Sequence, residues 1–207
     1  MTENPENPTT PEETVNTPNH INPHAVTDYN RSVDALACFA LFCVAVAGKA
    51  SKVQSPKVAA FISALRADLG VSHWNALSMV AAISDADLRA RLEAVKLGQY
   101  TRITRTYRAL AGLGDDLSGV SLEALQAACG LKTSRFFLLH SRPDVRVAVL
   151  DTHILAWLRE QGHAAPKSTP QSPKSYARLE SVFLRLCDEK GLSPAAFDLA
   201  IWSSRAK

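Results

Sequence analysis

The chain has 207 residues, of which 46% are hydrophobic and 21% are charged, proportions that are ordinary for a globular protein and sufficient for one packed domain, with one or two lobes, plus a tail. No apolar run reaches the roughly 18 residues that span a bilayer, and the first residues lack the basic and apolar regions of a secretory signal, so we expect a cytoplasmic protein that does not bind membranes. Residues 1–25 contain four glutamates and no lysine or arginine, which leaves 23 basic against 16 acidic residues in 26–207, a net charge of +7 that is compatible with nucleic acid as a partner.

The N-terminal region has the composition of a disordered tail. Residues 1–25 hold five of the eleven prolines and only four apolar residues, Met1, Val15, Ile21 and Ala25. Such a segment cannot bury enough surface to offset the entropy that it would lose on ordering. We therefore predict a disordered, acidic and proline-rich tail over residues 1–30 and one folded domain over residues 31–207.

The four cysteines are scattered along the chain without a CxxC pair, at Cys38, Cys43, Cys129 and Cys187. This spacing fits neither a disulfide framework nor a zinc site, and it does not match the four-cysteine loop that holds an iron–sulfur cluster in some DNA-repair enzymes. We expect reduced cysteines and no metal.

From about residue 31 onward, the sequence predicts helices. Apolar residues recur at helical spacing from Val33 to Gly48, which favours a buried helix, and again from Val58 to Leu65, after Pro56. A further helix is expected to begin after Ser84, because a serine hydroxyl is a good cap and acidic residues follow it at once.

The next helix boundaries are marked by small and polar residues. Gly112 and Gly114 are expected to end one helix, and Ser118 or Ser121 to cap the following one. The apolar, partly β-branched stretch from Val145 to Leu150 is compatible with a strand, although no partner strand is evident.

Two helices over residues 174–190 and 194–204 complete the all-α prediction, after a loop that contains Pro166, Pro170 and Pro173.

The residues with a candidate chemical role lie in the middle of the chain, before the loop with Pro166 and the last two predicted helices. The Gly-Leu-Lys-Thr run at 130–133 predicts a tight turn that places Lys132 at the start of a helix, and Asp151 precedes the helix that contains His153 and Leu155. A lysine that loses its proton can attack the C1′ atom of a nucleotide sugar and form a Schiff base. A nearby carboxylate stabilises the positive charge that grows on the sugar as the base leaves. The pattern therefore points to cleavage of a glycosidic bond.

Each of the two residues also has a purely structural interpretation. Asp151 is a good N-cap, and a lysine after a glycine turn, such as Lys132, is often merely solvated. Taken alone, either residue is more readily explained as structural. Their combination around one helical hairpin favours the functional interpretation.

The segment from Leu125 to Leu158 resembles the helix-hairpin-helix DNA glycosylase superfamily, and most closely the archaeal-type 8-oxoguanine DNA glycosylase/AP lyases. Three further stretches are similar to motifs of that family: Phe-Cys-Val-Ala-Val-Ala at 42–47, Lys-Leu-Gly at 96–98 with Tyr100, Arg102 and Tyr107, and Phe-Asp-Leu-Ala-Ile-Trp at 197–202. The resemblance covers about residues 31–207. It implies a two-lobed helix-hairpin-helix glycosylase fold whose hairpin and catalytic core span about residues 118–160.

The resemblance also implies roles for individual residues. Lys132 would be the nucleophile and Asp151 the catalytic carboxylate. The base pocket would be formed by Tyr100, Trp202, Asp198 and Lys207. The DNA backbone would be contacted by Gly130, His153, Arg135 and Arg102. Ala128 stands where the family usually has the first hairpin glycine, and Thr152 where it has an arginine.

Other basic residues, Lys96, Arg105, Arg108, Arg142 and Arg146, are further candidates for a DNA-facing groove, although such clusters are often only solvated faces.

The expected activity is that of a monomeric, bifunctional DNA glycosylase/AP lyase. It would excise 8-oxoguanine from double-stranded DNA through a lysine Schiff base, followed by β-elimination, and this chemistry requires no metal or organic cofactor. Two alternatives stay open at this point: a glycosylase for another damaged or modified base, and a non-catalytic helix-hairpin-helix DNA-binding protein.

Overall fold

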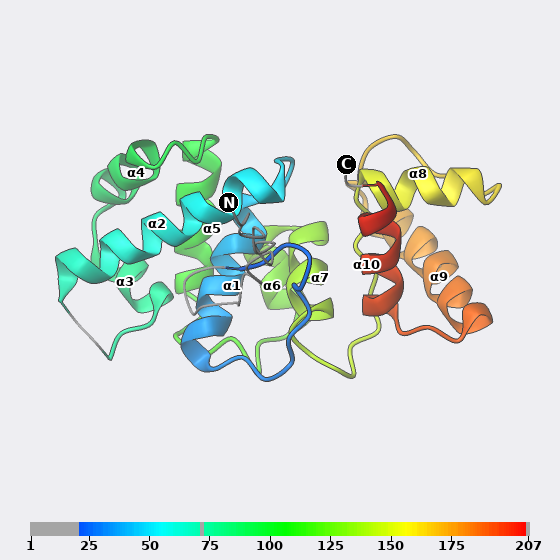
Figure 1. Cartoon of the computed structure of the whole chain (residues 1–207), viewed down its shortest axis with the longest axis horizontal. Helices are drawn as coiled ribbons and strands as arrows, with labels where there is room; N and C mark the ends of the chain where they lie inside the picture. The colour runs from blue at the N-terminus through cyan, green and yellow to red at the C-terminus, as the bar shows by residue number, and fades with distance from the viewer. Residues whose placement is uncertain (1–20, 71–72, 206–207) are drawn as a thin grey trace, which may run out of the picture.

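The structure, a computed structural model, describes residues 21–70 and 73–205, and within these ranges it contains ten helices and no strand. Two lobes lie side by side (Figure 1). The first lobe consists of seven helices: α1 (Val33–Ala45), α2 (Ser51–Leu69), α3 (Ala76–Ala82), α4 (Asp85–Ala94), α5 (Tyr100–Ala111), α6 (Leu122–Cys129) and α7 (Leu131–Leu139). The second lobe consists of three: α8 (Thr152–Glu160), α9 (Pro173–Lys190) and α10 (Pro194–Arg205).

Helix α1 is the centre of the first lobe. Every residue from Leu36 to Ala45 is buried, because the helix is apolar on all sides and α2, α3, α5 and α7 pack around it. Phe39 lies against Phe42 and Phe137 with ring centroids 6.2 and 5.8 Å apart. The helix begins at a serine cap, where the Ser32 hydroxyl accepts a hydrogen bond from the Ala35 amide.

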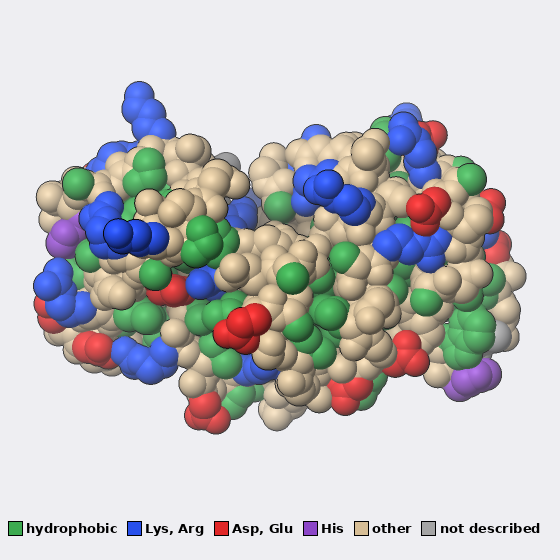
Figure 2. Space-filling view, turned by 180° about the vertical axis from the view of Figure 1, so that it is seen from behind, with side chains coloured by type: hydrophobic (Ala, Val, Ile, Leu, Met, Phe, Trp, Pro, Cys, Tyr) green, Lys and Arg blue, Asp and Glu red, His purple; other side chains and the backbone are tan. Residues whose placement is uncertain are grey.

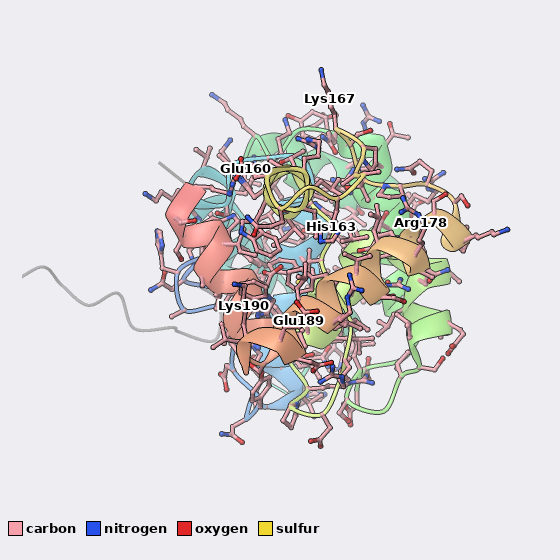
Figure 3. All side chains as sticks on the ribbon, turned by 90° about the vertical axis from the view of Figure 1, so that its right-hand side faces the viewer. Glu160, His163, Lys167, Arg178, Glu189 and Lys190 are labelled. Atoms are coloured by element: carbon pink, nitrogen blue, oxygen red, sulfur yellow. The ribbon has the colours of Figure 1, made fainter. Side chains whose placement is uncertain are left out.

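The second lobe has a separate core. Leu155 and Leu158 of α8 pack with Tyr176 and Phe183 of α9 and with Phe197 of α10. Figure 3 views this lobe from its outer side, where side chains of both charge signs project from the surface, among them Glu160, His163, Lys167, Arg178, Glu189 and Lys190. Between the lobes lies a small apolar cluster of Leu139, Val147, Val149 and Ala195.

Residues 140–151 connect the two lobes. The stretch from Val145 to Leu150 in this connector, whose composition is compatible with a strand, does not form one. The Tyr176 hydroxyl donates to the Ala148 carbonyl at 2.8 Å and accepts from the Leu150 amide at 3.1 Å. A Glu180 carboxylate oxygen accepts from the Ala148 amide at 2.9 Å. Side chains of α9 therefore supply the hydrogen bonds that a neighbouring strand would have supplied.

Residues 21–31, the N-terminal segment, pack on the body of the molecule. Ile21 and Val26 are buried, and the Ser55 hydroxyl donates to the Ile21 carbonyl. The Arg31 guanidinium donates to the carbonyls of Val26, Asp28 and His140 at 2.6 to 2.8 Å. The predicted tail of residues 1–30 is therefore wrong for residues 21–30, whereas its first 20 residues lie outside the described part of the chain.

Most predicted helix boundaries agree with the structure, and two do not. Ser84, Ser121 and Asp151 cap α4, α6 and α8, and α5 ends before Gly112. Helix α2 begins before Pro56 instead of after it. Helix α3, whose Asn75 cap accepts from the amides of Leu77 and Ser78, was not predicted. No helix in the described ranges has both the length and the hydropathy needed to cross a bilayer.

Candidate active site

The hairpin formed by α6 and α7 turns at a single residue, Gly130. Its backbone has φ 85° and ψ 171°, a combination that is essentially restricted to glycine. Lys132 is the second residue of α7, and Ala128 lies within α6, where alanine is a good helix former. The side chain of Lys132 is partly buried, and its Nζ makes no hydrogen bond or ion pair with any described residue. Its amine is therefore available to a ligand.

Asp151 occupies the equivalent place at the start of α8. One carboxylate oxygen, Oδ1, accepts from the amides of His153 and Ile154, each at 2.9 Å, and so caps the helix. The other oxygen makes no hydrogen bond to the described part of the chain. The cap fixes the carboxylate in position while it leaves one oxygen for an interaction with a ligand.

Lys132 and Asp151 line the same cavity, which has a volume of about 1260 Å³. Helices of both lobes contribute to its wall, and the space-filling view shows a notch between the two lobes (Figure 2). The cavity exceeds the roughly 300–1,000 Å³ of ordinary small-molecule sites, so it has room for a nucleotide together with part of a strand. Of the other predicted site residues, the cavity lining includes Arg102, Gly130, His153, Asp198 and Trp202.

A buried polar chain supports one side of this cavity. His140 Nε2 lies 3.3 Å from Asp198 Oδ2, and His140 Nδ1 lies 2.7 Å from Thr27 Oγ1. Burial raises the pKa of the Asp198 carboxyl, while the hydrogen bond with His140 opposes this rise. The charge of Asp151 also raises the pKa of Asp198 and that of Lys132 lowers it, so these three groups lie close enough to act on one another.

Two cysteines, Cys43 and Cys129, also line the cavity, but their protonation makes them poor candidates for the nucleophile. Burial raises the pKa of Cys129 to about 12 and that of Cys43 well above its usual range. Both are therefore neutral thiols at physiological pH, and a neutral thiol is a poor nucleophile. Among the described residues, no three His, Cys, Asp or Glu side chains are grouped as a metal site would require.

Arg135 was predicted to contact the DNA backbone, but its side chain is buried inside the protein. Its side chain is only 8% exposed and pairs with Glu180 of α9, with 2.8 Å between Nε and Oε1. Arg108 and Arg142, two of the other basic residues, likewise donate to backbone carbonyls of the first lobe. Burial and internal pairing of an arginine cannot be inferred from its charge alone.

Arg102 and Tyr100 also differ from the expectation. Arg102 lines the cavity, but its guanidinium donates to the Val44 carbonyl at 3.0 Å and to the Gln99 side chain. Tyr100 is not part of the cavity lining; it packs against the first-lobe core, with the Arg89 guanidinium 6.0 Å from its ring centroid. Lys207 lies outside the described residues.

Two residues near the cavity were missed. Gln99 lines it in a left-handed conformation, with φ 51°, directly after Gly98. The His24 and Trp202 rings form a T-shaped contact, with ring centroids 5.4 Å apart, beside Pro23 in the cavity wall. Gly98 was a sequence signal for a turn at Gln99. His24 had no such signal, because it lies in a segment whose composition indicated disorder.

Solved structures of 8-oxoguanine DNA glycosylases share this fold. One is the Methanocaldococcus jannaschii 8-oxoguanine glycosylase/lyase in complex with a 15mer DNA containing 8-oxoguanine, with a TM-score of 0.62 and 18% identity over 85% of this chain and 83% of that chain. Another is the 8-oxoguanine DNA glycosylase of Thermotoga maritima, with a TM-score of 0.63 and 19% identity over 85% and 82% of the two chains.

A further structure of the M. jannaschii glycosylase has a TM-score of 0.61 and 17% identity over 88% of this chain and 84% of that one. No family model matches the sequence. The similarity confirms the predicted all-α glycosylase fold.

Proposed function

We propose that this protein is a bifunctional DNA glycosylase/AP lyase that excises 8-oxoguanine from double-stranded DNA. The observation that carries the proposal is the shared cavity: Lys132 and Asp151 come from different lobes and different helix N-termini, yet both line it. The fold is that of proteins whose names state 8-oxoguanine glycosylase activity, and one of them holds DNA with that lesion.

The chemistry begins at Lys132. Its amine loses a proton and attacks C1′ of the damaged nucleotide, the bond between C1′ and the base breaks, and the base leaves with the bonding electrons and takes up a proton. The uncapped oxygen of Asp151 stabilises the positive charge on the sugar in the transition state. The C1′–O4′ bond then breaks and O4′ takes up a proton, which leaves a Schiff base between C1′ and the lysine. Loss of a C2′ proton and cleavage of the C3′–O3′ bond release the strand on the 3′ side with its phosphate, and hydrolysis of the Schiff base releases Lys132.

The cavity wall supplies groups for recognition of the flipped base. The Trp202 ring is an apolar surface on which a base that has left the duplex can stack, and the buried carboxyl of Asp198 is a hydrogen-bonding group in the same wall. The amides at the start of α7, next to Gly130, have no side-chain cap and suit a phosphate of the same strand. We propose that the protein acts on DNA as a monomer.

Borohydride trapping on a duplex that contains 8-oxoguanine tests the mechanism. The wild type is expected to give a covalent protein–DNA adduct and Lys132→Gln none, because the amide cannot form a Schiff base. Asp151→Asn keeps the cap and loses the charge, so we expect a trapping rate at least about 100-fold lower. Lys190→Gln, at the far end of α9 (Figure 3), is the matched control and is expected to trap at the wild-type rate.

Several outcomes would contradict the proposal. A wild type that binds DNA without an adduct would indicate a non-catalytic DNA-binding protein, and equal trapping by Lys132→Gln would exclude this lysine as the nucleophile. Faster trapping on a duplex with a different damaged base, in a panel of matched duplexes, would overturn 8-oxoguanine as the substrate.

A further inference from the structure

A buried ion pair joins the two lobes directly behind the proposed catalytic residues. Arg135 of α7 and Glu180 of α9 are 8% and 14% exposed in their side chains. They meet in a two-bond arrangement, with 2.8 Å between Nε and Oε1 and 3.3 Å between Nη2 and Oε2. The guanidinium also lies 4.4 Å from the ring centroid of Tyr176. Each partner is thus held on several sides.

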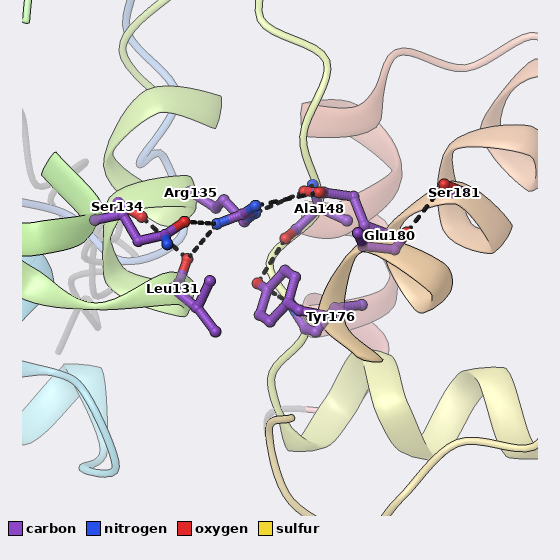
Figure 4. Close-up of polar contacts among 10 residues, drawn as sticks. Leu131, Ser134, Arg135, Ala148, Tyr176, Glu180 and Ser181 are labelled. Carbon is purple, nitrogen blue, oxygen red and sulfur yellow. Dashed lines mark hydrogen bonds and ion pairs between the residues drawn. The ribbon is translucent and has the colours of Figure 1, made fainter. Parts of the chain in front are cut away.

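The hydrogen bonds of this pair lead to the neighbours of both catalytic residues (Figure 4). On one side, Arg135 Nη1 donates to the carbonyl of Leu131, the residue before Lys132, at 3.1 Å. On the other side, Glu180 Oε1 accepts from the Ala148 amide, and the Tyr176 hydroxyl bonds the carbonyl of Ala148 and the amide of Leu150, the residue before Asp151. One connected network therefore joins the backbone at Lys132 to the backbone at Asp151.

We propose that Arg135, Glu180 and Tyr176 form a positioning clamp that sets the separation of Lys132 from Asp151. The inference rests on the proposed function, because it concerns the geometry of that reaction. None of the three side chains lines the cavity, so they act through the backbone of the two catalytic residues.

The clamp explains why charges are buried at this position. A buried ion pair is often no more stabilising than apolar residues of the same size, because both charges lose their hydration. Such a pair does fix a relative orientation, because a planar guanidinium and a carboxylate form two parallel hydrogen bonds in only one arrangement. The lobes also meet through a small apolar cluster, through the hydrogen bond of His140 with Asp198 and through the ring contact of His24 with Trp202. The ion pair adds a directional contact that restricts their relative position.

Glu180→Gln tests the clamp, with Asp188→Asn as its matched control. Asp188 also lies on α9 and pairs with Arg146 of the same connector, but that pair is exposed, at 55% and 61%. In single-turnover trapping on 8-oxoguanine duplex, we expect Glu180→Gln to slow the reaction by at least about tenfold, because a displacement of about 1 Å costs up to roughly 100-fold in rate. Asp188→Asn should keep the wild-type rate.

Binding separates positioning from general damage. The affinity of Glu180→Gln for a duplex with a tetrahydrofuran abasic analogue, which cannot react, should stay within about threefold of the wild type, so that the loss falls on the rate and not on binding. Tyr176→Phe removes only the hydroxyl and keeps the ring, and it should slow trapping in the same way. Equal losses in rate and binding, or a wild-type rate in both variants, would overturn the clamp.

A distance measurement tests the clamp without catalysis. Spin labels at Ala127→Cys on α6 and Gln161→Cys after α8, in a Cys129→Ser background, report the separation of the lobes. We expect a broader distance distribution in Glu180→Gln and an unchanged one in Asp188→Asn. An unchanged distribution in Glu180→Gln would refute the clamp. A broadened one in a protein that never traps DNA would instead refute the proposed function and leave the interlobe constraint standing.

Discussion

At the level of single residues, the capping role of Asp151 is compatible with the catalytic role that we propose for it. The structural interpretation of this residue as an N-cap is confirmed by its two hydrogen bonds to the amides of His153 and Ile154. Because both bonds end on the same oxygen, the second oxygen stays available for the chemistry that we propose. The cap itself orients that oxygen, so a residue that satisfies a structural rule can be the better catalyst for it.

Asp198 should make stability depend on pH. Burial raises its pKa in the folded protein above the ordinary value of 3.8, so the unfolded chain loses this proton at a lower pH than the folded one. The stability that the protonated carboxyl confers is full below pH 3.8 and is lost as the pH rises through the folded pKa. Asp198→Asn has no carboxyl to ionise, so its stability lacks this loss. The free energy of unfolding of the variant should therefore rise relative to that of the wild type as the pH rises from about 4, by up to about 1.4 kcal/mol per pH unit.

Urea unfolding at a series of pH values from about 4 to 8 measures this difference. The exposed Asp188→Asn variant serves as the control, and its difference from the wild type should change little with pH. A constant difference for Asp198→Asn as well would show that the buried carboxyl has an ordinary pKa.

At the level of elements, the hairpin depends on the backbone conformation of Gly130. Apart from its two chain neighbours, no described residue has an atom within 4 Å of the position where a Cβ of residue 130 would stand. An alanine there is therefore strained by its positive φ and not by a clash. We expect Gly130→Ala to lower the free energy of unfolding by about 1–3 kcal/mol, as measured in urea. Gly119→Ala, which also has open space but no positive φ, should change it by less than about 0.5 kcal/mol. Equal effects of the two substitutions would mean that the hairpin can adopt another turn.

The sequence predicted those elements whose ends carry strong local signals. Helices α9 and α10 agree within a residue, because Pro173, Gly191 and Pro194 mark their boundaries. Helix α3 was missed because it has only seven residues and so displays too little periodicity. The stretch from Val145 to Leu150 has the composition of a strand, but its hydrogen-bond partners are side chains more than 20 positions away, and only the fold brings them together.

The site residues, like the helices, were predictable where a local sequence signal marks them. Lys132, Asp151 and Trp202 were predictable as parts of one cavity, since a glycine turn, a helix cap and a terminal motif each mark their places. The resemblance assigned Arg135 to the DNA backbone and Tyr100 to the base pocket. In the structure Arg135 pairs internally with Glu180, and Tyr100 is partly buried against the first-lobe core. Whether a charge or ring is used internally depends on contacts between distant helices, which local sequence does not contain.

At the level of the whole molecule, Arg31 ties the N-terminal segment to the rest. Its guanidinium serves three carbonyls, including that of His140 at the end of α7, and lies 3.9 Å from the ring centroid of Phe39. Arg31→Met keeps the packing and leaves the carbonyls without this donor, so we expect a loss of about 3 kcal/mol in the free energy of unfolding.

Thermal and urea unfolding would measure this loss. Arg91→Met, which removes a single pair with the exposed Asp68, is the matched control and should cost less than about 1 kcal/mol. If Arg31→Met were as stable as that control, the N-terminal segment would contribute little to the fold.

The meeting of His24 with Trp202 has a consequence for biosynthesis. Translation runs from the N-terminus, so the hairpin with Lys132 and the cap at Asp151 leave the ribosome before α10 is made. Until Trp202 has emerged, the cavity lacks the wall against which His24 rests. An incomplete chain therefore carries Lys132 without the surface on which, in the reaction that we propose, an extruded base would stack. The complete pocket arises only when the two ends of the described chain come together, which makes its assembly a late event in folding.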